Sequence, residues 1–76
     1  MTELEFMEDF SDNLIYYLQT KGWSQEELAE RSGLSQAAIN RYMQCKRMPT
    51  VKAIVNICCA FDCVIEDLIL TDEEIE

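Results

Sequence analysis

The four cysteines of this 76-residue chain are its most reactive side chains. The chain has no histidine and no Cys-x-x-Cys pair, and its cysteine spacing fits no common zinc-binding pattern. A catalytic thiol needs a general base, and the sequence offers none near Cys45, the cysteine with neighbouring cations. Because cysteine is otherwise a small buried hydrophobe, we expect reduced thiols and no enzyme, catalytic residue, metal, cofactor or disulfide framework. The cysteines are Cys45, Cys58, Cys59 and Cys63.

A second group of side chains has hydrogen-bonding rather than covalent chemistry. Gln36, Ala37, Asn40 and Arg41 follow one another at a spacing that leaves them together on one side of a helix. Glutamine can pair with two atoms of adenine, arginine can pair with guanine, and an alanine methyl group can contact the thymine methyl group. Each of the four is equally compatible with a solvated helix face, so both interpretations stay open from these residues alone.

The charge distribution bears on the same question. The net charge of −9 argues against nucleic acid at first sight, because nucleic-acid-binding domains are usually basic. Residues 20–52, however, hold all six cations and three acids, a net charge of +3, and the other twelve acids lie towards the two ends. This separation favours a DNA-binding surface in the middle of the chain, although the overall negative field should weaken non-specific binding.

Two helix starts follow each other in this central part. Ser24 can cap a helix, and Glu27, three residues later, would complete a capping box. Trp23 and Leu28 occupy the two positions of a hydrophobic staple around that cap. The first of the two helices is therefore predicted over about residues 25–32.

The same device recurs at Ser35, with Leu34 before it and Ile39 after it. Gly33 lies between the two helices, where a chain that leaves a helix usually needs a left-handed residue. Two short helices joined by a tight turn with glycine form a helix-turn-helix unit. The unit is predicted over about residues 24–44, with its second helix over 36–43 or 36–44.

Residues 1–20 have apolar side chains three or four apart, which predicts an amphipathic helix that stops at Gly22. Asp9 or Ser11 could start this helix afresh, so the first ten residues are compatible with helix, a separate turn or a flexible arm. Three apolar residues outside the stripe suggest a self-association surface: Phe6, Ile15 and Tyr16. The stripe itself consists of Leu4, Met7, Phe10, Leu14, Tyr17 and Leu18.

After Pro49, Thr50 caps a helix predicted to reach about residue 61, apolar over more than half its circumference and therefore central to the core. A turn at 62–63, a short helix at about 65–70 and a fraying acidic tail at 71–76 complete the chain. Residues 1–76 are thus predicted to form one all-α domain of five short helices around a single core. The apolar residues of the fourth helix are Val51, Ile54, Val55, Ile57, Cys58 and Phe61.

These motifs resemble the lambda-repressor-like (Cro/repressor, Xre) family of bacterial and phage DNA-binding domains. The resemblance covers roughly residues 10–70. It implies a five-helix fold and a sequence-specific DNA-binding transcriptional regulator of repressor type, whose second helix-turn-helix helix reads the major groove. The residues that carry it are Gln25, Leu28, Ala29, Gly33, Leu34, Ser35, Ile39, Lys46, Arg47, Met48 and Pro49.

The resemblance also implies roles for individual residues. The partner would be double-stranded DNA with a palindromic operator, bound by a homodimer that forms through the last helix, the N-terminal segment or both. Base reading falls to Gln36, Ala37, Asn40 and Arg41. Phosphate contacts fall to Ser24, Gln25, Gln44, Lys46, Arg47 and Lys52, with backbone amides at the start of the first helix of the unit.

The sequence departs from the family pattern in three respects. Leu18 and Met43 stand where the family often has an Arg–Glu ion pair, and replacing both partners by hydrophobes is often neutral. Cys45 stands where glycine is usual after the second helix, so we expect that helix to end differently. Asp62 and Val64 replace a glycine and a capping serine, which predicts a looser junction before the last helix.

The runner-up function is a protein-interaction module on the same fold, antitoxin-like or antirepressor-like, with weak DNA binding. Its acidic ends would bind a basic partner surface. No 18-residue apolar run appears, and the acidic N-terminus lacks the basic start of a signal peptide. The sequence therefore predicts a soluble cytoplasmic protein without a membrane segment.

Overall fold

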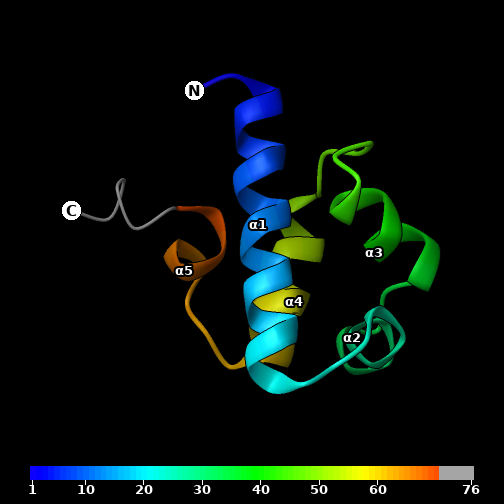
Figure 1. The fold of residues 1–76 in the computed structure, drawn as a ribbon. Coiled ribbons are helices and arrows are strands. Elements are labelled where there is room, and N and C mark those ends of the chain that lie inside the picture. The colour runs from blue at the N-terminus through cyan, green and yellow to red at the C-terminus, as the bar shows by residue number, and fades with distance from the viewer. Residues whose placement is uncertain (71–76) are drawn as a thin grey trace.

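The computed structural model describes residues 1–70. Within them the chain folds into five helices and no strands, as predicted (Figure 1). The predicted acidic tail, residues 71–76, lies outside the described residues. The helices are α1 (Glu3–Lys21), α2 (Gln25–Ser32), α3 (Gln36–Met43), α4 (Val51–Phe61) and α5 (Ile65–Ile69).

Helix α1 runs without interruption from the start of the chain, so neither Asp9 nor Ser11 begins it afresh. Its N-cap is Thr2, whose hydroxyl accepts the Glu5 amide at 3.1 Å while the Glu5 carboxylate accepts the Thr2 amide at 3.3 Å. This reciprocal capping box satisfies amides that would otherwise lack an intrahelical partner. Ser11 is instead buried in mid-helix, and its hydroxyl donates to the carbonyl of Met43 at 2.7 Å.

Three helices end in the same left-handed turn. Gly22 (φ 70°), Cys45 (φ 57°) and Asp62 (φ 58°) end α1, α3 and α4, and in each case the next amide bonds back to a carbonyl five residues earlier. This pattern is the Schellman motif. The expectation that α3 would end differently because Cys45 replaces glycine is therefore wrong, since the cysteine adopts the glycine-like conformation. The amide of Lys46 accordingly donates to the carbonyl of Arg41 at 2.9 Å.

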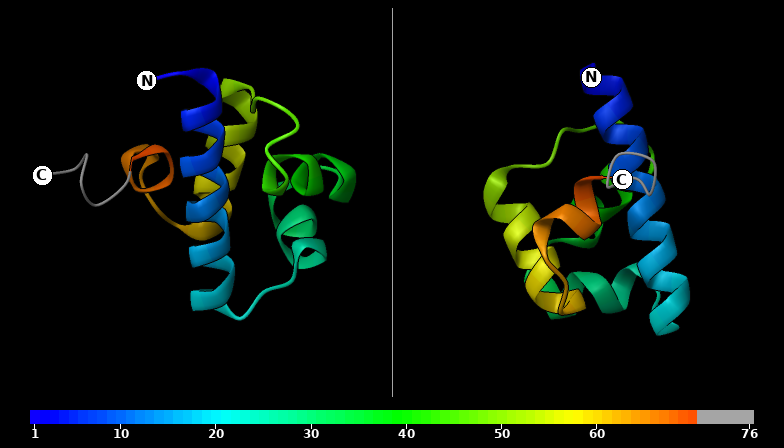
Figure 2. Two further views of the ribbon diagram at one scale, coloured as in Figure 1. Left: turned by 45° about the horizontal axis from the view of Figure 1, so that its top comes forward. Right: turned by 90° about the vertical axis from the view of Figure 1, so that its left-hand side faces the viewer.

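The core lies between α1 and the other four helices, and Figure 2 shows α1 with α5 on one side and α2 and α3 on the other. Contrary to the sequence pattern, Leu4 is 57% exposed, whereas Phe6 packs on the core with its ring 6.2 Å from that of Phe10. The buried apolar residues are Phe10, Leu14, Leu18, Leu28, Ala29, Ile39, Tyr42, Ala53, Ile54, Ile57, Cys58, Phe61 and Leu68.

Helix α4 buries a narrower face than its composition suggests. Val51 is 75% exposed and Val55 is 47% exposed, although both belong to the apolar part of the helix. The buried face of α4 contacts α2 and α5, so the two valines point away from both neighbours. The helix is central to the core as predicted, but its apolar surface is wider than the face that the fold buries.

Helix α5 is held by contacts that the sequence did not suggest. The Asp67 carboxylate accepts the amide of Val64 at 3.3 Å, which is the half of a capping box that needs no serine. From α1, the Asn13 side-chain amide donates to the carbonyls of Leu68 and Leu70 at 2.7 and 3.1 Å. Asn13 thus links the end of α5 to the middle of α1. No helix of the described residues is both long and apolar enough to span a membrane.

Candidate nucleic-acid interface

The turn between α2 and α3 is built by local hydrogen bonds. Gly33 takes the left-handed conformation (φ 74°), as predicted. The Ser32 hydroxyl donates to the carbonyl of Ala29 and accepts the amide of Leu34, each at 3.3 Å. The Ser35 hydroxyl then accepts the amide of Ala38 at 3.0 Å and starts α3. These bonds fix the angle at which α3 leaves α2.

The start of α2 differs from the prediction in one contact. The Ser24 hydroxyl accepts the amide of Glu27 at 3.1 Å, so the serine cap is present. The Glu27 carboxylate, however, does not complete a capping box and instead pairs with Arg31 at 3.2 Å. The Arg31 guanidinium also lies over the Trp23 ring, 4.3 Å from its centroid. Arg31, in the last turn of α2, thus interacts with both a carboxylate and an aromatic ring.

Helix α3 separates its two faces as expected. Ile39 is fully buried and Tyr42 is 4% exposed, whereas Met43 packs only partly against the core. The four predicted base-reading side chains are all exposed to solvent on the outer side of this helix: Gln36, Ala37, Asn40 and Arg41. Sequence reasoning therefore placed the faces of α3 correctly.

One contact joins the outer side of α3 to the start of α2. The Asn40 side-chain NH2 group donates to the carboxamide oxygen of Gln25 at 3.3 Å. Gln25 is half-buried, and Ser24 beside it is exposed. The structure thus brings one predicted phosphate-contacting residue next to one predicted base-reading residue.

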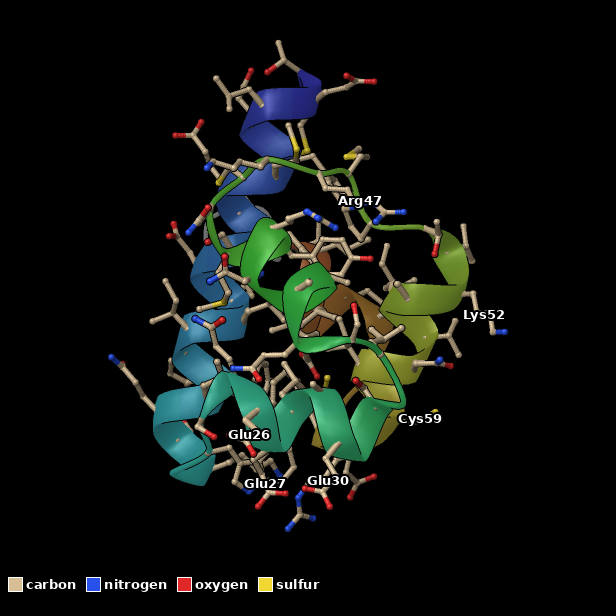
Figure 3. The ribbon with its side chains drawn as sticks, turned by 90° about the vertical axis from the view of Figure 1, so that its right-hand side faces the viewer. Glu26, Glu27, Glu30, Arg47, Lys52 and Cys59 are labelled. Atoms are coloured by element: carbon tan, nitrogen blue, oxygen red, sulfur yellow. The ribbon has the colours of Figure 1, made fainter. Side chains whose placement is uncertain are left out.

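The remaining predicted phosphate-contacting residues lie at the exit of α3 and the start of α4. All four are exposed: Gln44, Lys46, Arg47 and Lys52. Figure 3 views the molecule from the side of α3 and α2, with Arg47 in the loop after α3 and Lys52 on α4. Pro49, in the same loop, is buried and anchors it to the domain.

The acids of α2 occupy the opposite edge of this face. Figure 3 shows Glu26, Glu27 and Glu30 together along α2, away from Arg47 and Lys52. Arg47 and Lys52 are therefore separated in space from the acids of α2, whereas Arg31 lies beside them and pairs with Glu27. A polyanion would meet the favourable end of this surface at the exit of α3.

Two contacts behind this face were not predicted from the sequence. Ser11 joins α1 to the end of α3 through its bond to the Met43 carbonyl, and the Cys45 thiol lies 3.6 Å from the Met7 carbonyl. Both contacts link residues more than thirty positions apart, so no local motif marks them. Leu18, at one of the positions of the replaced ion pair, is buried, and Met43 at the other is half-buried.

The protein is a helical domain in which α3, the second helix of the helix-turn-helix unit, presents a polar face beside a cationic loop. This arrangement is typical of helix-turn-helix DNA-binding domains. The sequence matches the helix-turn-helix family HTH_3 over residues 14–68, and the chain belongs to this lambda-repressor-like family. The resemblance inferred from the motifs is thus confirmed. The family consists of DNA-binding regulators rather than enzymes, which also confirms that the protein is not an enzyme.

Among solved structures, the fold is similar to that of a hypothetical transcription factor, NHTF, from Neisseria. The superposition has a TM-score of 0.87 and covers 97% of this chain and 85% of that one, with 24% sequence identity. At this identity the similarity establishes the fold alone. No curated protein sequence matches this chain significantly.

Proposed function

We propose that this protein is a sequence-specific transcriptional repressor that reads the major groove with α3. The observation that carries the proposal is the outer side of α3, where glutamine, alanine, asparagine and arginine side chains are exposed while Ile39 and Tyr42 hold the helix to the core. Base edges are read by side chains of these types from one helix in the groove. Gln36 and Arg41 are the two best suited to bidentate pairing.

Phosphate contacts would flank this helix on both sides. On one side, the amides at the start of α2 and the Gln25 side chain would bind a phosphate. The bond from Asn40 uses the carboxamide oxygen of Gln25 and leaves its NH2 group as a donor. On the other side, Lys46, Arg47 and Lys52 would hold the backbone.

The operator is expected to be palindromic and bound by a homodimer, with half-sites about 34 Å apart. Exposed apolar side chains on two elements support a dimer contact: Ile65, 39% exposed on α5, and Tyr16, 61% exposed on α1. Sedimentation equilibrium of Ile65→Lys and Tyr16→Lys, which measures the dimer dissociation constant, distinguishes a contact through α5 from one through α1. The variant that dissociates the dimer marks the interface, and dimers of unchanged stability in both would exclude these surfaces.

The test of DNA reading uses duplexes selected from a random pool and a scrambled duplex of the same composition, with fluorescence anisotropy across a salt series. Gln36→Ala and Arg41→Ala should each lose about 1–3 kcal/mol on the selected duplex and relax preference at one base position. Lys46→Ala or Arg47→Ala should weaken binding to both duplexes equally and lower the dependence of log affinity on log salt concentration by about 1.

Glu66→Ala serves as the control. Glu66 is exposed on α5, on the far side of α1 from α3, so its removal should leave the preferred sequence unchanged (Figure 1). If the α3 and loop variants bind both duplexes as the parent does, this surface does not bind DNA. The interaction-module function, antitoxin-like or antirepressor-like, would then replace the repressor function.

A further inference from the structure

The turn at the end of α4 places two cysteines next to each other. Asp62 is left-handed, its amide donates to the carbonyl of Cys59 at 3.3 Å, and the amide of Cys63 donates to the carbonyl of Cys58 at 3.0 Å. In this Schellman motif one of the two bonds joins residues five positions apart, and the side chains of those two residues typically touch. Here both residues are cysteines, Cys58 and Cys63.

The side chains agree with the backbone. The thiols of Cys58 and Cys63 each influence the pKa of the other, and the Tyr17 hydroxyl of α1 influences the pKa of Cys63, so the three groups are near one another. Cys58 is 8% exposed and Cys63 is half-buried, so the pair lies at the edge of the core. The other two thiols are placed differently, with Cys59 exposed on α4 and Cys45 beside α1.

We propose that Cys58 and Cys63 are a redox-active dithiol that closes into a disulfide when the protein meets a low-molecular-weight disulfide. A disulfide needs Cα atoms about 4.4–6.8 Å apart with the side chains facing each other. The direct backbone bond between the two residues holds them at the two positions of the Schellman motif whose side chains meet, which favours this geometry. The site is independent of the proposed DNA-reading surface.

The exchange balances in two steps. The Cys63 thiolate, the more exposed of the two, attacks the small disulfide, forms a mixed disulfide and releases one small thiolate. The Cys58 thiolate then attacks the Cys63 sulfur and releases the second small thiolate. The two protein protons pass to the two released thiolates. The protein pair loses two electrons, and the small disulfide gains them.

The surroundings make this exchange slow at neutral pH. Burial raises the pKa of Cys63 to about 12, and it raises the pKa of Cys58 as well. The groups that face the pair are Cys59 on α4, Tyr17 on α1, and Glu66 and Asp67 on α5, of which the two carboxylates further disfavour thiolates. Because the thiolate is the reactive form, the rate should rise about tenfold per pH unit below these pKa values.

The test compares two variants of the full chain, each retaining one pair of thiols. Cys45→Ser with Cys59→Ser keeps the proposed pair, and Cys58→Ser with Cys63→Ser is the matched control. Each is incubated with oxidised glutathione at pH 8 and pH 9, and free thiols and intact mass are measured. Circular dichroism checks that both are folded.

In the first variant both thiols should disappear with a mass loss of two hydrogens, about tenfold faster at pH 9, and dithiothreitol should restore them. The control should gain glutathione adducts. Peptide mapping of the oxidised natural sequence should give a 58–63 link, which tests the proposal even if a variant fails to fold. Stable glutathione adducts on Cys58 or Cys63 would overturn it, and so would a pair that remains reduced at pH 9 long after the control has reacted completely.

Discussion

The left-handed residue at the exit of α3 gives the sharpest test of the fold, because a side chain stands where glycine is usual. Cys45 has φ 57°, and its amide donates to the carbonyl of Tyr42 at 3.2 Å. Such a conformation costs a residue with a Cβ atom about 1–2 kcal/mol. The half-buried thiol, 3.6 Å from the Met7 carbonyl, offsets part of this cost.

Comparing Cys45→Gly with Cys45→Ala isolates the backbone cost, because both changes remove the thiol. Only glycine relieves the left-handed strain, but glycine also loses about 0.4–1 kcal/mol through the greater freedom of the unfolded chain. The glycine variant should therefore be more stable than the alanine variant by about 1 kcal/mol. For a domain of this size that difference is about 4–8 °C in Tm.

The assay is thermal and urea denaturation followed by circular dichroism. Asp12, exposed in the middle of α1, supplies the control. At this ordinary helical position Asp12→Ala should be more stable than Asp12→Gly by about 1 kcal/mol in the free energy of unfolding. The order of the two substitutions should thus invert between the two sites. A Cys45→Ala variant as stable as Cys45→Gly would refute the left-handed exit of α3.

Three further outcomes follow from single contacts. Ile39→Asp should unfold the domain, because a carboxylate would be buried without a partner. Arg41→Ala, on the exposed side, should change the free energy of unfolding by less than about 0.5 kcal/mol. Equal melting temperatures for Ile39→Asp and the parent would contradict this. Asn13→Ala removes both bonds to the end of α5 and should cost about 1–2 kcal/mol, with faster amide exchange confined to α5; unchanged exchange there would exclude the clamp. Hydrogen bonds from Thr2 lower the pKa of Glu5, so the capping box stabilises the start of α1 above the carboxyl group's ordinary pKa and loses this effect as pH falls through the lowered value. An NMR titration should show the Glu5 pKa rising in Thr2→Ala, and no rise would disprove the contact.

The positions of the helices were predictable because their ends are local. Ser24, Ser35 and Thr50 each accept the amide three residues on, and Gly33 supplies the left-handed turn between α2 and α3. Such bonds join neighbours in sequence, so a short motif contains both partners. The exposed side of α3 followed in the same way, because a helical period fixes which residues lie opposite Ile39.

The contacts that orient the helices could not be read in this way. Ser11 resembles a helix start in the sequence, yet its hydroxyl bonds to a carbonyl 32 residues away. Asn13 gave no signal at all, because its partners are 55 and 57 residues away. Val51 and Val55 belong to an apolar stripe, but whether a stripe is buried depends on which helix crosses it. Both valines stay exposed in this fold.

The same division holds for the candidate interface. The sequence by itself determined that residues 20–52 are cationic, and that Gln36 and Arg41 share one side of a helix. Only the packing of α2 against α3 and α4 decided that the glutamates of α2 lie along the edge away from Arg47 and Lys52 (Figure 3). Charge counted along a chain has no direction, whereas a potential depends on distances between charges, and those distances exist only once the helices are packed.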